Sequence, residues 1–179
     1  MPFCRAKSLV LLGLALIALP AIACDTNPTQ MRGELSGASA SGLVKRWWDG
    51  GKCEALLLDA ISSGRSDWLQ FAIAVAPYTD AWSAESLGVA LGAAMQRAPS
   101  RVLPLVGAGR FKLEICYPWN FDDSAEGTRR TRSGLPRAIR MFESFRATAL
   151  AKPAQECADN LRDALAHIEA TQPDAGSEH

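Results

Sequence analysis

Few side chains in this sequence are suited to catalysis. The 179 residues include only two histidines, His167 and His179. His179 ends the chain, and His167 lies near the end of an expected helix, where a cation stabilises the carbonyl end. The serine patterns G-x-S-x-G and S-x-x-K do not occur. A free Cys53 beside His167 would supply a nucleophile and a base, but an oxidising compartment disfavours the free thiol. The sequence therefore predicts no catalytic residue.

The segment 120–126, NFDDSAE, is the most polar cluster in the chain. Its oxygen-bearing side chains could converge on a hard cation such as calcium. The EF-hand pattern fails, because Ala125 stands where that motif needs glycine and Thr131 where it needs glutamate. Asp122 and Asp123 are adjacent, so they do not form the facing pair that glycoside cleavage requires. We expect a solvated loop and predict no metal site. The alternating oxygen donors are Asn120, Asp122, Ser124 and Glu126.

The cysteines favour disulfides over zinc. Cys4 lies in a predicted leader, and no C-x-x-C pair occurs among the other four. In an oxidising compartment four cysteines allow three connectivities. We prefer Cys116 with Cys157, because Cys157 lies on an apolar helical face and Cys116 ends an apolar stretch. Cys24 with Cys53 follows if Cys24 is not acylated. No cofactor is predicted.

Residues 1–23 have the three parts of a secretory signal peptide. Arg5 and Lys7 precede the apolar run 8–19, and Ala21 and Ala23 provide the small residues at a cleavage site. A signal peptidase would cut after Ala23. Alternatively, the stretch AIAC resembles the lipobox of bacterial lipoproteins, in which Cys24 would be acylated and anchored at the inner membrane. The expected location is the periplasm, free or anchored as a lipoprotein.

Charge and length limit the classes of function. Removal of residues 1–23 takes away Arg5 and Lys7 and leaves 156 residues with 17 basic against 19 acidic side chains. A net charge of −2 argues against a dedicated nucleic-acid binder. The remaining length is enough for one domain with a substantial core. No later segment is long and apolar enough to predict a membrane span.

Hydrophobic periodicity predicts one small all-α domain of five or six short-linked helices, supported by disulfides. Residues 24–42 are rich in Gly and Ser and predict a flexible tether, residues 43–170 the helical domain, and residues 171–179 a disordered tail. Residues 110–117 alternate apolar and polar side chains, which fits a short strand, an extended segment or a short helix equally well. The expected helices begin near residues 53, 66, 83, 99, 136 and 153, with Ser66 and Ser83 as caps and Pro136 as a first residue.

Three features are candidates for partner binding. Trp47 and Trp48 are adjacent, so they cannot both face one helical core stripe; one is then exposed for binding, or the pair clamps the start of the domain. Arg129, Arg130 and Arg132 follow the acidic pair Asp122 and Asp123. With Arg137 and Arg140 they make a basic segment that could contact anionic lipid headgroups, cell-wall polymer or an acidic partner, or form a solvated loop balanced by its own acids. Gly88 and Gly92 lie one turn apart, which predicts close packing of a neighbouring helix.

The stretch from Ser66 to Val106 resembles part of a group of small exported helical proteins of proteobacteria. The shared pattern is a Trp-Leu pair, then Pro-x-Thr-Asp-Ala, Ser-x-x-x-Leu, a proline and Val-Leu. The late cysteines fit the group only loosely. The resemblance spans about residues 52–165, implies a shared helical fold and carries over no catalytic residue. The matching positions are Gly64, Trp68, Leu69, Pro77, Thr79, Asp80, Ala81, Ser83, Leu87, Pro99, Val102 and Leu103.

These patterns favour a non-enzymatic binding protein of the bacterial envelope that recognises another protein as an inhibitor, immunity factor or assembly accessory. Export, cross-linking and the lack of a catalytic set support this hypothesis. A cell-wall hydrolase using carboxylates of residues 120–126, Asp122 and Glu126 among them, is the first alternative. A structural helical scaffold is the second.

Overall fold

The computed structural model describes residues 24, 27–37, 39–49, 51–117 and 124–171. Within these ranges the chain forms eight α-helices and two short 3-10 helices and no strand, so the predicted all-α class is confirmed. None of these helices is long and apolar enough to cross a membrane. Helix α1 lies in the segment that the sequence predicts as a tether and α2 begins in it, which explains most of the excess over five or six.

The N-terminal helices correct the prediction of a tether over residues 24–42. Helix α1 (Pro28–Glu34) begins with a proline, and the side chain of Asn27 accepts hydrogen bonds from two backbone N–H groups of its first turn. Helix α2 spans Ala40–Trp47. The two helices bury Met31 and Val44, each 1% exposed. These few apolar side chains dock α1 against α4, and that tertiary contact outweighs a Gly/Ser-rich composition.

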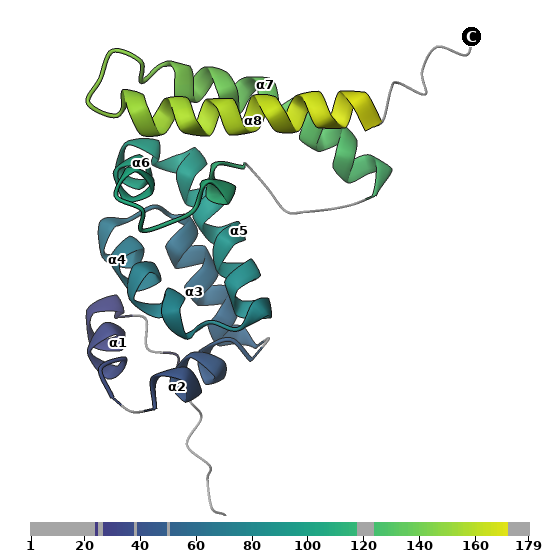
Figure 1. Cartoon of the computed structure of the whole chain (residues 1–179). Coiled ribbons are helices and arrows are strands. Elements are labelled where there is room, and N and C mark those ends of the chain that lie inside the picture. Colours follow the sequence, from purple (N-terminus) through teal and green to yellow (C-terminus); the bar gives the residue numbers. More distant parts are fainter. Residues whose placement is uncertain (1–23, 25–26, 38, 50, 118–123, 172–179) are drawn as a thin grey trace, which may run out of the picture.

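Four helices form the centre of the molecule: α3 (Lys52–Ser62), α4 (Ser66–Val75), α5 (Ala81–Arg97) and α6 (Pro99–Gly107). Figure 1 shows them between α1 and α2 at one end and α7 and α8 at the other. The turn from α3 to α4 requires Gly64, whose φ is 68° and where a Cβ would lie 2.6 Å from the Cβ of Ala98. Phe71 and Met95 are fully buried in the core between these helices.

The first residues of α4 and α5 differ from the predicted caps. Ser66 is the first helical residue of α4 and Arg65 its N-cap. A short 3-10 helix, η1 (Ala76–Tyr78), precedes α5, which is capped by Asp80 rather than Ser83. The Asp80 carboxylate accepts from the Ser83 backbone N–H at 3.0 Å, and the Ser83 hydroxyl accepts from the Asp80 N–H at 2.9 Å. This reciprocal capping box makes Ser83 the third residue of the helix.

Residues 113–116 form η2 (Leu113–Cys116), a 3-10 helix, so of the three alternatives for residues 110–117 the structure has the short helix. It lies against α5 where Gly92 has no side chain. A Cβ at Gly92 would be 2.7 Å from the carbonyl oxygen of Tyr117. The close approach predicted at the two glycines therefore involves the end of η2 at Gly92, and Gly88 has no neighbour within 4 Å of such a Cβ.

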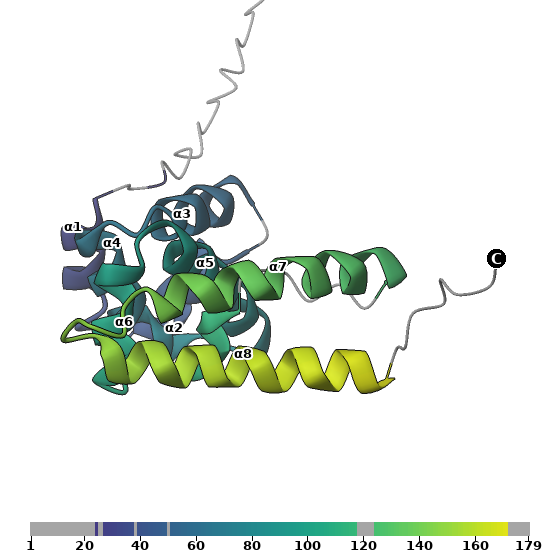
Figure 2. The ribbon, with the colours of Figure 1, turned by 90° about the horizontal axis from the view of Figure 1, so that it is seen from above.

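Helices α7 (Ala125–Glu143) and α8 (Ala151–Thr171) form an antiparallel pair that lies side by side in both views and crosses one end of the central helices (Figures 1 and 2). Helix α7 begins eleven residues before Pro136, which lies inside it, so the predicted start at Pro136 is wrong. Ser124 caps the true start, and the ion pairs of Glu126 with Arg129 and Arg130 support the first turns. At the other end, Glu143 pairs with Arg162 of α8.

Candidate functional site

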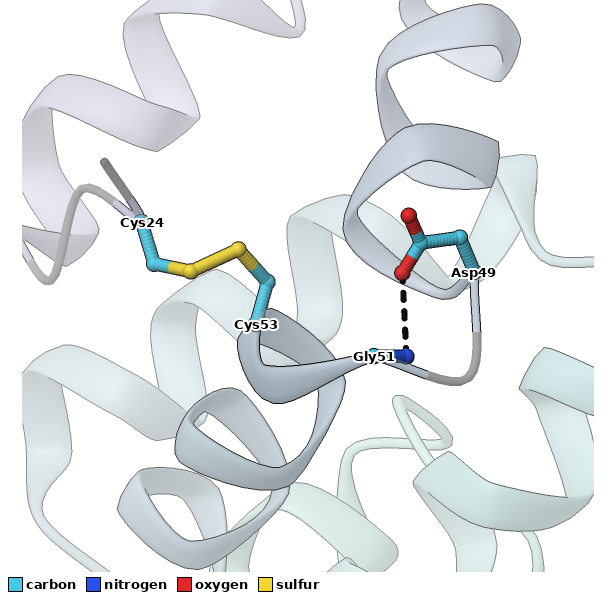
Figure 3. The surroundings of a disulfide bond; sticks show 4 residues. All are labelled: Cys24, Asp49, Gly51 and Cys53. Carbon is cyan, nitrogen blue, oxygen red and sulfur yellow. Dashed lines mark hydrogen bonds between the residues drawn. A yellow bond between two sulfur atoms is a disulfide. The ribbon is translucent and has the colours of Figure 1, made fainter. Parts of the chain in front are cut away.

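Two disulfides connect elements that are distant in the sequence. Cys116 of η2 joins Cys157 of α8, and Cys24 joins Cys53 in the first turn of α3, each with a Cα–Cα distance of 5.4 Å. Figure 3 shows the second bond beside the turn in which the Asp49 carboxylate accepts from the Gly51 N–H at 3.0 Å. Both distances lie in the usual range for disulfides. Every cysteine in the described part of the chain is bonded, which leaves no thiol there for nucleophilic catalysis.

The Cys24 sulfur has a direct bearing on the two alternatives for the N-terminus. Acylation would place a thioether on the same sulfur that bonds Cys53 in the structure. A sulfur atom cannot form both bonds, so the disulfide and the lipid exclude each other. A protein with the Cys24–Cys53 disulfide is therefore not acylated at Cys24, and an acylated protein lacks that disulfide.

The described residues contain no cluster suited to binding a metal ion. No three His, Cys, Asp or Glu side chains within these ranges are grouped closely enough to hold a metal ion. His167 is exposed on α8, and its carbonyl accepts a hydrogen bond from the Thr171 hydroxyl. Asn120, Asp122 and Asp123 lie outside the described residues. Ser124 and Glu126 serve α7, where the Ser124 hydroxyl accepts from the Gly127 N–H at 3.0 Å and Glu126 pairs with Arg129 at 2.6 Å.

The adjacent tryptophans are packed into the domain. Trp48 is 5% exposed, and Trp47 is half-buried with its ring centroid 5.8 Å from that of Phe71. This placement matches the alternative in which the pair clamps the start of the domain. Among the tryptophans in the described ranges, the exposed one is Trp82, at 64%, in the first turn of α5. The exposure of Trp82 could have been predicted from its position two residues after the N-cap, because the first turn of a helix often lies at the surface.

A shallow cavity of about 170 Å³ lies between α2 and the start of α5. Trp48 lines it, but its indole nitrogen is shielded from solvent and has no hydrogen-bond partner within the described ranges. A ligand in the cavity would not reach that donor. Asp80 and Ser83 also line the cavity, and both are already used by the capping box. We therefore assign no ligand to it.

The arginines of α7 form a distinct surface. We call the exposed residues on its outer side the arginine stripe. They recur at helical spacings of three and four, which places them on one face. The opposite face is buried and includes Leu135 and Phe142 at 0% and 1% exposure. The stripe comprises Glu126, Arg129, Arg130, Ser133, Arg137 and Arg140, all exposed.

The stripe carries four guanidinium groups and one carboxylate. Glu126 pairs with Arg129 and lies 3.9 Å from Arg130, and both arginine side chains keep about two thirds or more of their surface exposed at 74% and 68%. Arg137 and Arg140 form no ion pair with any described residue. Arg132, which the sequence groups with the others, is half-buried and lies outside the stripe. The structure thus places four of the five arginines of the predicted basic segment on one exposed face and separates Arg132 from them.

Comparison with known proteins adds no relative: no family model, no curated protein and no solved structure matches the chain.

Proposed function

We propose that this chain is a non-enzymatic, exported binding protein of the bacterial envelope that recognises an acidic surface of another protein through the arginine stripe of α7. The observation that carries the proposal is the composition of that face, with four exposed arginines and a single carboxylate on a rigid helix. Arginine binds carboxylates through two parallel N–H donors, which gives both orientation and affinity. An inhibitor, an immunity factor and an assembly accessory would all use such a surface.

The stripe suits a protein partner better than a lipid bilayer. A helix that lies in a membrane interface inserts an apolar face, but the apolar face of α7 is buried in the domain. The stripe itself includes no apolar side chain. Attraction of basic side chains to anionic lipid does not require an apolar face, so the test includes vesicles. A nucleic-acid partner is disfavoured by the net charge of −2 left after removal of residues 1–23.

Export to an oxidising compartment is the second part of the proposal. Two disulfides support it, because such bonds persist outside the cytosol. We infer cleavage after Ala23 without acylation, because Cys24 is bonded to Cys53. The protein would then be free in the periplasm rather than anchored to the inner membrane.

The test compares two charge-reversed proteins in binding to envelope extract. Arg137→Glu with Arg140→Glu reverses the part of the stripe that forms no ion pair within the described ranges. The matched control is Arg46→Glu with Arg110→Glu, which makes the same charge change at exposed positions of α2 and the loop after α6. Circular dichroism checks that both variants keep their helices.

We expect wild type and control to retain the same partner at low salt and to release it as salt increases. The stripe variant should bind at least about tenfold more weakly, as expected for loss and reversal of charges at an interface. Equal binding by both variants would contradict the proposal. Binding of the wild type to vesicles of anionic lipid, with no protein retained, would assign the stripe to membranes instead. If the wild-type protein retains neither a protein nor vesicles, the result contradicts the proposal and favours the structural scaffold.

A further inference from the structure

A second surface, which carries carboxylates instead of guanidinium groups, lies between α5 and η2. It surrounds a cavity of about 190 Å³ with a mainly apolar lining. Val89 and Ile115 contribute apolar side chains from the two elements, and Gly88 leaves space because nothing lies within 4 Å of where its Cβ would be. We call this surface the α5–η2 groove. Its lining residues are Ala84, Glu85, Gly88, Val89, Glu114, Ile115 and Tyr117.

The η2 wall of the groove is held from two sides. On the α5 side, the missing side chain of Gly92 lets the Tyr117 carbonyl approach the helix. On the α8 side, the disulfide joins Cys116 to Cys157, and the Asn160 amide donates to the Leu113 carbonyl at 3.4 Å. These contacts fix the groove in the folded protein, so a partner would not have to order it on binding.

Two carboxylates line the groove without a cationic partner. Glu85 and Glu114 are both exposed, and neither forms an ion pair with any described residue. The phenol of Tyr117 responds to the same environment: burial, and then the charges of Asp163 and Glu114, raise its pKa above the ordinary value of 10. The groove therefore combines negative potential with an apolar interior.

Exposed apolar side chains continue the surface beyond the cavity. Trp82 precedes Glu85 by three residues and Val89 by seven, so the three share one face of α5. Trp82 is 64% exposed, and Leu113, at the start of η2, is 36% exposed. Large side chains of this kind supply much of the binding energy in protein interfaces.

We propose that the α5–η2 groove receives a lysine or arginine side chain of a protein partner. The aliphatic stem would contact Val89 and Ile115, and the cationic end would lie near Glu85 and Glu114. The Tyr117 ring could add a cation–π contact to the same group. The volume suits one such side chain, and the two carboxylates disfavour an anion. This inference goes beyond the proposed function, because the arginine stripe requires an acidic partner surface and the groove requires a basic one.

The experiment uses blocked amino acids as probes of the folded, disulfide-bonded protein. N-acetyl-lysine methylamide and N-acetyl-arginine methylamide are titrated while the backbone amide signals of the ¹⁵N-labelled protein are followed. N-acetyl-norleucine methylamide is a neutral probe of similar length, and N-acetyl-glutamate methylamide is the anionic one. We expect the cationic probes to shift the signals of Gly88, Val89 and Ile115 in a saturable way.

Two variants separate charge from shape. Glu85→Gln with Glu114→Gln should weaken binding of the lysine probe about tenfold, the combined effect of two exposed charges. The matched control, Glu34→Gln with Glu169→Gln, removes two exposed carboxylates elsewhere and should leave binding unchanged. Gly88→Leu should abolish binding by filling the cavity, in a helix that gains a better helix-forming residue.

The proposal is overturned if the cationic probes shift none of the groove signals. It is also overturned if the norleucine or glutamate probe binds as tightly as lysine, or if the glutamine pair at residues 85 and 114 binds lysine as well as wild type does. Because this test leaves α7 unchanged, its failure would be distinguishable from failure of the arginine stripe to bind an acidic partner.

Discussion

Tyr117 is the residue that reports most directly on the charge of the α5–η2 groove. Its pKa is raised by burial and by the nearby carboxylates Asp163 and Glu114. We predict that Glu114→Gln lowers the pKa of Tyr117 toward 10, because one negative charge that disfavours the phenolate is removed. Ultraviolet titration at alkaline pH measures this in a Tyr78→Phe background, where Tyr117 is the remaining tyrosine.

The sign of the associated stability change follows from proton linkage. A raised pKa means that the folded state holds the phenolic proton more tightly than the unfolded state does. The contribution of Tyr117 to stability is therefore complete below pH 10 and is lost as the pH rises through the folded-state pKa. Glu34→Gln is the control and should leave the titration unchanged. If the pKa of Tyr117 is unchanged in the Glu114→Gln variant, the Glu114 carboxylate does not contribute to the negative potential at Tyr117.

Single residues differed in how far the sequence could predict their roles. The sequence predicts the Cys116–Cys157 pair, because Cys157 lies on an apolar helical face and Cys116 ends an apolar stretch. It predicts the Cys24–Cys53 pair only if Cys24 is not acylated. The burial of Trp47 and Trp48 could not be decided, because adjacent residues leave open which of them faces the core. Arg137 and Arg140 could be grouped with Arg129 from the sequence, but the half-burial of Arg132 could not be predicted, because the sequence predicts a helix that starts at Pro136 and an irregular segment over residues 125–135.

At the scale of elements, the two glycines of α5 predict opposite mutational effects. Gly88→Ala should raise the free energy of unfolding by about 0.5–1 kcal/mol, because alanine favours the helix and nothing lies within 4 Å of the added methyl group. Gly92→Ala should lower it by about 1–3 kcal/mol, because the methyl group would lie 2.7 Å from the Tyr117 carbonyl oxygen. Urea denaturation under non-reducing conditions measures both changes.

The two variants control for each other, since both make the same substitution in the interior of one helix. If both stabilise the protein, η2 can move away from α5, and the groove wall is less fixed than its contacts indicate. If both destabilise it, the space beside Gly88 is filled in solution. Either result would weaken the case that the groove is preformed.

Element type was easier to predict than element boundaries. The apolar repeats that gave α3, α4, α5 and α8 recur over several turns and bury their faces, so periodicity was sufficient. Helix α1 buries only Pro28 and Met31, with Leu35 buried just after its end, and its order depends on docking against α4, which local composition does not reveal. The first half of α7 is rich in Arg, Thr and Gly, and it is stabilised by the Ser124 cap and by ion pairs instead of an apolar stripe.

The whole molecule places surfaces of opposite charge on different elements. The arginine stripe lies on α7, and the carboxylates of the groove lie on α5 and η2. A nearly neutral total charge therefore hides a strong local asymmetry. If both proposals hold, the domain binds an acidic surface at α7 and a basic side chain at the α5–η2 groove.

The bonding state of the four cysteines is a property of the whole chain and of the compartment in which it folds. When the full chain is produced with residues 1–23, we expect a periplasmic protein that begins at Cys24 and contains two disulfides. Intact-mass spectrometry should give the mass of residues 24–179 less the hydrogens lost in both bonds. Alkylation without reductant should label no cysteine, because all four are bonded.

Reduction should then expose four thiols and lower the stability of the domain. The bonds close loops with sequence separations of 29 and 41 residues, and the chain-entropy model assigns each about 3–4 kcal/mol. Acylation predicts a different molecule at every point of comparison: a lipid mass on Cys24, a reactive thiol at Cys53 and recovery with the membrane fraction. Because one sulfur cannot carry both bonds, a single mass measurement decides whether Cys24 carries a lipid or a disulfide.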